Sequence, residues 1–258
     1  MNKAEKALYE LNEVDELAEG NSPVHRFSAL CKLLTTVIYI LILMSFGKYD
    51  LTGVLCMAVY PLIAYPLSRI RITTGLRKML PVMPLVAFVG IFNPLLDRQL
   101  IQIAGMTVRG GWVSFLVLLV KGILVLLASF LLAATTKMDA IGNALRKLHI
   151  PQIMVTMLLL TYRYISLLTE EVAVMTTAYH LRAPNQKGIH ISAWGSFFGQ
   201  LLLRTMDKAK ALYLSMELRG YNGEFPLVRT QNDNTGSIVW LISWTAVSAL
   251  IRFYGGFR

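Results

Sequence analysis

The stretch from Gly111 to Ala134 is strongly apolar and carries a single charged residue, Lys121, and its length limits the fold more than any other feature. A helix of about 20 apolar residues crosses the hydrocarbon core of a bilayer, which is about 30 Å thick. Comparable stretches cover residues 29–46, 51–67 and 238–253. Because lipid offers the backbone no hydrogen bonds, such stretches fold as helices. We therefore predict an all-α integral membrane protein.

The composition supports this class of protein. Charged residues make up 16% and hydrophobic residues 55% of the 258 residues, whereas soluble domains carry about 25% charged residues. A net charge of +10 could suit a nucleic-acid-binding protein, but no RNA- or DNA-binding module is recognisable. In a membrane protein, an excess of lysine and arginine marks the cytoplasmic loops. We expect the lipid bilayer, and no nucleic acid, as a partner.

The cysteines and histidines do not suggest a metal site. Cys31 and Cys56 lie in or beside apolar segments, and two such cysteines form neither a disulfide framework nor a metal site. The four histidines are scattered and show no metal-ligand spacing. The first thirty residues are charged and lack the apolar centre of a signal peptide. We expect no catalytic, cofactor-binding or metal-binding residues in this chain.

The basic segment "SRIRITTGLRK" sets the orientation of the chain in the membrane. It follows the second apolar stretch and contains Arg69, Arg71, Arg77 and Lys78 but no acidic residue. The positive-inside rule places such a segment in the cytoplasm. Two crossings separate it from the N-terminus, which we therefore also place inside.

The remaining apolar stretches give about five crossings. Residues 79–96 contain three prolines, which predict a broken or partly re-entrant helix, with an outer loop at 97–109. Residues 169–233 are too charged to cross the membrane, and four crossings already return the chain inside. Residues 150–168 are therefore predicted not to cross fully, since Arg163 would be costly at the bilayer centre.

These features predict four segments. Residues 1–28 form an N-terminal segment, with an amphipathic helix over residues 2–19, and residues 29–134 form a membrane domain of about four spans. Residues 135–233 form a cytoplasmic domain, and residues 234–258 a final transmembrane helix.

Two helices of the predicted cytoplasmic domain end at an arginine. The first carries an apolar stripe from Ile165 to Tyr179 and ends at Arg182, because Pro184 disfavours helical geometry at Ala183.

The second helix, around residues 200–219, has Leu202, Met206 and Tyr213 on one face. It ends at Arg219, where Gly220 supplies the left-handed conformation that commonly stops a helix.

Each arginine could simply stabilise the negative end of its helix, worth about 0.3–1 kcal/mol. Alternatively, two helices that end alike indicate a pair of similar cytoplasmic partners, because arginine is well suited to anchor a desolvated contact.

Several motifs resemble one known family. "AYHLRAP" and "SMELRGY" resemble the two Ala-Arg-Gly-type coupling motifs of the transmembrane T component of energy-coupling factor (ECF) transporters. "SPVHRFSALCKLL" and "LLAATTKMDAIGNALRKLHIP" resemble other parts of that family, and "TYRYISLLTEE" resembles its cobalt-type, CbiQ-like branch. Two departures are Ala183, where the family has glycine, and the absence of an Asp-Pro after the first histidine.

The resemblance implies a coupling scaffold in a prokaryotic cell (inner or plasma) membrane, with no enzymatic activity of its own. Two cytoplasmic ABC-type ATPases, which bind ATP and Mg, would dock on the coupling helices, and a separate membrane protein would bind the substrate, which the branch suggests is cobalt. The chain itself has no Gly-x4-Gly-Lys-Ser/Thr phosphate loop. The residues implied to couple to the ATPases are Arg182, Ala183, Glu217, Arg219 and Gly220.

Three alternatives stay open. The cargo of such a T component could instead be nickel or a vitamin. An intramembrane protease with a Glu-Glu-x3-Arg motif would need arginine where Met175 stands. A stand-alone secondary transporter is expected to show broken helices in both of its halves, whereas only residues 79–96 look broken.

Overall fold

The computed structural model describes residues 13–96, 100–103, 106–184, 188–221 and 235–255. The chain forms two compact units. The membrane unit comprises Leu17–Ile141 and Thr230–Arg258, and the hairpin unit comprises Met1–Glu16 and Gly142–Arg229. The four-segment division made from the sequence remains a prediction.

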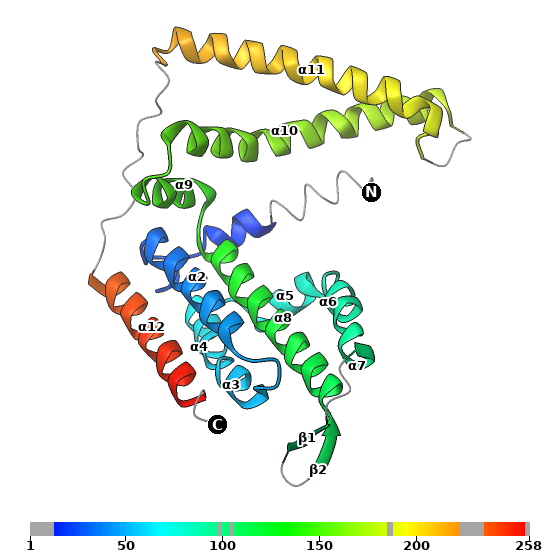
Figure 1. Ribbon diagram of the computed structural model, residues 1–258. Helices are drawn as coiled ribbons and strands as arrows, with labels where there is room; N and C mark the ends of the chain where they lie inside the picture. The colour runs from blue at the N-terminus through cyan, green and yellow to red at the C-terminus, as the bar shows by residue number, and fades with distance from the viewer. Residues whose placement is uncertain (1–12, 97–99, 104–105, 185–187, 222–234, 256–258) are drawn as a thin grey trace. The chain divides into compact units, whose positions relative to one another are not determined.

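The membrane unit is built almost entirely from helices, as predicted (Figure 1). Its elements are α2 (Ala29–Ser45), α3 (Leu51–Cys56), α4 (Val59–Ser68), α5 (Ile72–Met79), α6 (Met83–Gly90), α7 (Phe92–Leu96), β1 (Leu100–Ile103), β2 (Met106–Arg109), α8 (Gly110–Thr135) and α12 (Thr235–Gly255). Helix α2 packs against both α12 and α8. Helix α9 (Met138–Lys147) follows α8 and leads into the hairpin unit.

Four described helices are long and apolar enough to cross a membrane, or up to five if the bent pair of α5 and α6 is one span. This number agrees with the predicted count of about five, although the helices that make up the count are not all the predicted ones. Helix α2 is only 17 residues long, whereas Gln152–Arg182 qualifies by its length and composition. That residues 150–168 do not cross the membrane fully stays a prediction.

The third apolar stretch is broken, as its prolines predicted. Helices α5 and α6 meet at an angle of 62°, and Pro81 lies in the break between them. The first half of the pair begins at Ile72, earlier than the predicted start at residue 79. Arg77 and Lys78 are therefore part of a helix, where the sequence pattern had suggested a loop.

The predicted outer loop contains a small antiparallel hairpin that the sequence analysis missed. Strands β1 and β2 pair with Leu100 opposite Arg109 and Ile103 opposite Met106. The segment is rich in isoleucine, threonine and valine, which fit a pleated strand well. That composition was the signal in the sequence from which the two strands could have been predicted.

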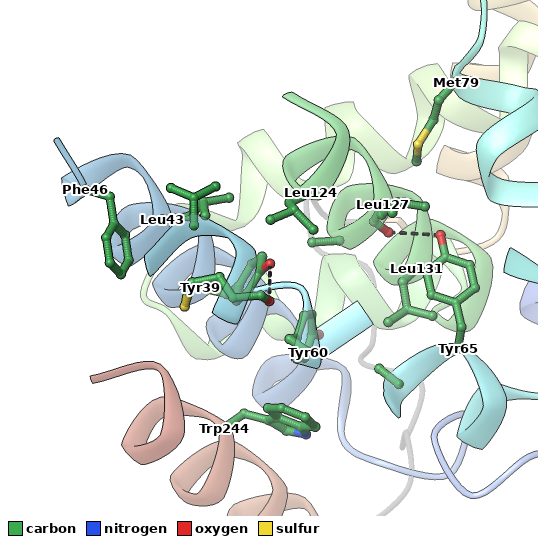
Figure 2. Close-up of a cluster of buried hydrophobic side chains, with 14 of the residues drawn as sticks. Tyr39, Leu43, Phe46, Tyr60, Tyr65, Met79, Leu124, Leu127, Leu131 and Trp244 are labelled. Carbon is green, nitrogen blue, oxygen red and sulfur yellow. Dashed lines mark hydrogen bonds between the residues drawn. The ribbon is translucent and has the colours of Figure 1, made fainter. Parts of the chain in front are cut away.

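The core of the membrane unit is aromatic as well as aliphatic (Figure 2). Tyr39 donates a hydrogen bond from its hydroxyl to the Met57 carbonyl at 2.9 Å, at the break between α3 and α4. Tyr65 donates to the Leu127 carbonyl at 3.1 Å. The ring of Tyr60 packs edge-on against Trp244 with 5.0 Å between the ring centres. Buried tyrosines thus satisfy their hydroxyls while filling the space between helices.

Helices α2 and α8 are joined by two buried lysines. Lys32, on α2, is 5% exposed and donates to the carbonyl of Thr135 at 2.6 Å, at the end of α8. Lys121, on α8, is 8% exposed and donates to the carbonyl of Phe46 at 2.6 Å, at the end of α2. The last carbonyls of a helix lack partners within it and carry partial negative charge. Each helix therefore caps the end of the other.

Candidate coupling site

The hairpin unit is dominated by two long antiparallel helices, α10 (Gln152–Arg182) and α11 (Ile191–Leu218) (Figure 1). The first is one continuous helix, so the segment from Gln152 onward and the predicted helix that ends at Arg182 are a single element. The second begins at Ile191, well before the predicted start near residue 200. His190 caps this start, because its side chain accepts from the Ser192 backbone N–H. Gly195 and Gly199 weaken the helical signal there, which explains the misplaced boundary.

Helix α10 ends at Arg182, as predicted. Ala183 leaves the helix with φ −130° and ψ 66°, and its backbone N–H still bonds to the carbonyl of Tyr179 at 3.0 Å. Any L-residue can adopt this negative φ. The chain therefore has no conformational need for glycine at position 183, which accounts for its departure from the family motif.

Helix α11 ends in a Schellman motif around Arg219. The Gly220 N–H bonds to the carbonyl of Glu217 at 2.9 Å, and the Tyr221 N–H bonds to the carbonyl of Met216 at 3.0 Å. Gly220 has φ +82°, which confirms the predicted left-handed residue. Because a Cβ on Gly220 would meet no atom within 4 Å, only the backbone conformation favours glycine here.

Both arginines lie at exposed helix ends, and each follows an exposed leucine. Leu181 is 79% exposed beside Arg182, and Leu218 is 89% exposed beside Arg219. Among the described residues, neither arginine forms an ion pair. We call these two Leu-Arg pairs the tips. The sequence analysis did not single out the two leucines, although the repeated Leu-Arg was visible in both motifs.

The two helices are joined by a charge cluster on Glu171. Its carboxylate accepts hydrogen bonds from Arg204 and from Lys208, the latter at 2.5 Å. The Glu171 side chain is 14% exposed, whereas both cations are more than 40% exposed. This cluster holds α11 against α10 between the tips.

The sequence leaves open a pair between Arg163 and Glu170, which lies seven residues further along α10, but this pair does not form. Neither residue forms an ion pair with any described residue, and both are exposed. The neighbouring acid, Glu171, is the one that bonds across to α11.

The N-terminal amphipathic helix predicted for residues 2–19 falls largely outside the described residues. Residues 13–18 are helical. Asp15 accepts a hydrogen bond from the Tyr162 hydroxyl at 2.5 Å within the hairpin unit. This contact attaches the end of the N-terminal segment to α10.

The described part of the chain contains no group of three or more histidine, cysteine or acidic side chains that could hold a metal ion. The tips contain a cation and an apolar side chain, without a nucleophile or a paired acid and base. Their chemistry suits a binding contact.

Residues 20–230 match the family model described as CbiQ, cobalt transport protein. The chain belongs to the CbiQ family. The matched range includes both tips. Among the relatives, the cobalt transport protein CbiQ of Rhodobacter capsulatus is 31% identical over 114 residues, which cover 43% of this chain and 46% of that protein.

Two further relatives are also named as transport proteins. The nickel permease LarQ of Lactiplantibacillus plantarum is 29% identical over 91 residues, covering 35% of this chain and 33% of that protein. The energy-coupling factor transporter transmembrane protein EcfT of Bacillus subtilis is 24% identical over 234 residues, covering 81% of this chain and 84% of that protein. The chain spans less than half the length of the first curated relatives that it matches.

Proposed function

We propose that this CbiQ-family membrane protein is the T component of an ATP-driven ECF-type importer, and that its tips bind two cytoplasmic ABC-type ATPases. The observation that carries the proposal is the pair of exposed Leu-Arg ends on two long helices of one hairpin. Arginine is enriched among the few residues that carry most of the binding energy of a protein interface. A hairpin with one tip on each helix offers one anchor to each ATPase.

The chain acts as a scaffold in this proposal. It has no phosphate-binding loop of the Walker type, so ATP and Mg are bound by the partner ATPases. Their movement is passed to the hairpin through the tips. The Glu171 cluster supports this role, because it joins α10 to α11 and lets a displacement at one tip move the other helix.

The cargo we propose is a divalent transition metal, cobalt or nickel, held by a separate substrate-binding membrane protein. The names of the relatives from Rhodobacter capsulatus and Lactiplantibacillus plantarum support this class of cargo. A vitamin remains the alternative for a chain of this kind. The proposed location is the prokaryotic inner or plasma membrane, with the hairpin in the cytoplasm.

The test is co-purification of the ATPases with tagged variants of this chain. The Arg182→Ala, Arg219→Ala double variant should lose the ATPases and metal uptake. Arg163→Ala is the matched control, because Arg163 is an exposed arginine of α10 that lies away from the tips. Normal ATPase retention and uptake by the double variant would overturn the proposal, and so would an equal loss in the control.

A further inference from the structure

The junction of α4 and α5 in the membrane unit carries a cluster of positive charge. Residues 51–96 contain four cations and no acidic residue, and all four cations fall between Arg69 and Lys78. Arg69, Arg71 and Arg77 are exposed, and none of the three forms an ion pair with another described residue. We call these three arginines the basic patch. Their charge is not neutralised within the described chain.

The core of the membrane unit holds the loop that carries the first two arginines. Helix α4 ends at Arg69, which has the left-handed φ of 58°. Ile70 follows, is 8% exposed and belongs to the hydrophobic core, whereas Arg69 and Arg71 on either side of it are exposed. The loop is therefore anchored by Ile70 and leaves both arginines on the outside.

Helix α5, which carries the third arginine, is amphipathic. With about 3.6 residues per turn, its polar side chains fall on one arc of the helix and its apolar residues on the opposite arc. The polar arc consists of Thr73, Thr74, Arg77 and Lys78, and the apolar arc of Ile72, Gly75, Leu76, Met79 and the C-cap Leu80.

Only part of the apolar arc packs against the membrane unit. Met79 is 5% exposed and belongs to the core. A Cβ on Gly75 would meet the Tyr65 hydroxyl at 2.5 Å, so α5 lies directly against α4, and it also contacts α8 (Figure 1). Leu76 and Leu80 are 48% and 66% exposed. Helix α5 thus presents an exposed apolar edge beside its cationic side.

The bend after α5 favours a position at the surface of the bilayer. Helices α5 and α6 meet at 62°, and α6 carries no charged side chain, whereas α5 ends with Arg77 and Lys78. Charged side chains are costly in hydrocarbon, and an amphipathic helix lies along the interface with its apolar side immersed. The bend lets α5 follow the interface while α6 enters the hydrocarbon.

The sign of the charge identifies the occupant. Anionic phospholipids such as phosphatidylglycerol carry a negative phosphate, and basic clusters next to a membrane span attract them. Arginine suits this contact, because its planar guanidinium can donate two hydrogen bonds to one phosphate. The exposed apolar edge beside the cations fits the acyl chains of the same lipids.

We propose that the basic patch binds the phosphate groups of anionic phospholipids in the leaflet predicted to be cytoplasmic, with Leu76 and Leu80 against their acyl chains. The proposal concerns this chain in lipid and needs neither an ATPase nor a substrate-binding partner. It therefore stands or falls separately from the proposed function.

The test is the lipid preference of the purified full chain in phosphatidylcholine vesicles. Electron spin resonance measures how much of a trace of nitroxide-labelled phosphatidylglycerol, or of labelled phosphatidylcholine, is immobilised at the protein. We expect the unmodified chain to prefer phosphatidylglycerol. The Arg71→Gln, Arg77→Gln variant should lower this preference about fivefold or more, because each basic residue at the surface contributes to the attraction.

Two control variants separate the basic patch from net charge and from folding. The Arg163→Gln, Lys210→Gln variant removes the same charge from exposed positions of the hairpin unit and should keep the preference. The Arg71→Lys, Arg77→Lys variant keeps the charge of the patch and should retain most of the preference.

Four results would overturn the proposal. Equal immobilisation of both lipids by the unmodified chain would leave an acidic protein surface as the partner of the patch. An unchanged preference in the glutamine variant of the patch would show that other residues bind the lipid. An equal loss in the hairpin control would show that net charge alone acts. An equal loss in the lysine variant would show that the substitutions disturb α5.

Discussion

The ammonium group of Lys32 donates a hydrogen bond to the backbone carbonyl of Thr135, the last residue of α8, at 2.6 Å. The same ammonium group reaches the carbonyl of His25 at 3.4 Å. One buried cation thus holds the beginning of α2, the end of α8 and the segment that precedes α2.

Lys32→Met should therefore destabilise the membrane unit. The substitution keeps the apolar stem but leaves the Thr135 carbonyl without its partner, and an unpaired buried acceptor costs about 1–3 kcal/mol. Thermal unfolding in detergent measures the change. The control is Lys137→Met, which breaks only the exposed pair with Glu19 and should cost under about 1 kcal/mol. Equal melting temperatures for the two variants would contradict the prediction.

Arg219→Ala should weaken ATPase docking by about 2 kcal/mol or more, as expected for an interface anchor. Arg219→Lys should restore only part of the affinity, because an ammonium lacks the planar fork of the guanidinium. Titration of purified ATPase against the chain in nanodiscs measures both. Full binding by the lysine variant would show that charge alone is recognised.

Leu218→Ala and Leu181→Ala should reduce docking without reducing stability. These leucines are 89% and 79% exposed in the free chain, so only a partner covers them, and burying one leucine is worth about 1.5–3 kcal/mol. The same titration, paired with thermal unfolding, separates the two effects. Leu167→Ala, on α10 away from the tips, should bind the ATPase normally.

Gly220→Ala should cost about 1 kcal/mol, because alanine is strained at φ +82°. Gly220→Asn should cost less, since asparagine visits this region more readily. Ala183→Gly, the reverse change at the other tip, should bring no gain, because φ there is −130°. Unfolding measurements on the three variants test this, and a clear gain from Ala183→Gly would show that the end of α10 was wrongly understood.

Glu171→Ala should loosen the contact between α10 and α11, because Arg204 and Lys208 lose their shared partner. Both cations are more than 40% exposed, so each pair is worth only about 0.2–1 kcal/mol. A double-mutant cycle of Glu171→Ala with Arg204→Ala measures the coupling. Glu170→Ala, the neighbouring exposed acid, should show none with Arg204→Ala.

Much of the fold follows from local sequence signals. The apolar length of residues 111–134 predicted α8, and the prolines after residue 80 predicted the bend between α5 and α6. At the site, Pro184 and Gly220 marked the ends of both long helices. These signals are reliable because they act through the backbone over a few residues.

The parts that sequence reasoning missed depend on contacts between distant residues. Nothing near Lys121 in the sequence indicates that it caps α2 at Phe46. The choice of Glu171 over Glu170 as the acid facing α11 depends on how the two helices are rotated against each other. The early start of α11 was hidden by two glycines, which lower helix propensity although the helix continues through them.

The two lysines that cap α2 and α8 use peptide carbonyls as acceptors, with no carboxylate in either bond. A peptide carbonyl does not take up a proton in mildly acidic water, unlike the side chains of aspartate and glutamate. A fall in the pH around the protein should therefore leave both hydrogen-bonded links between these helices intact.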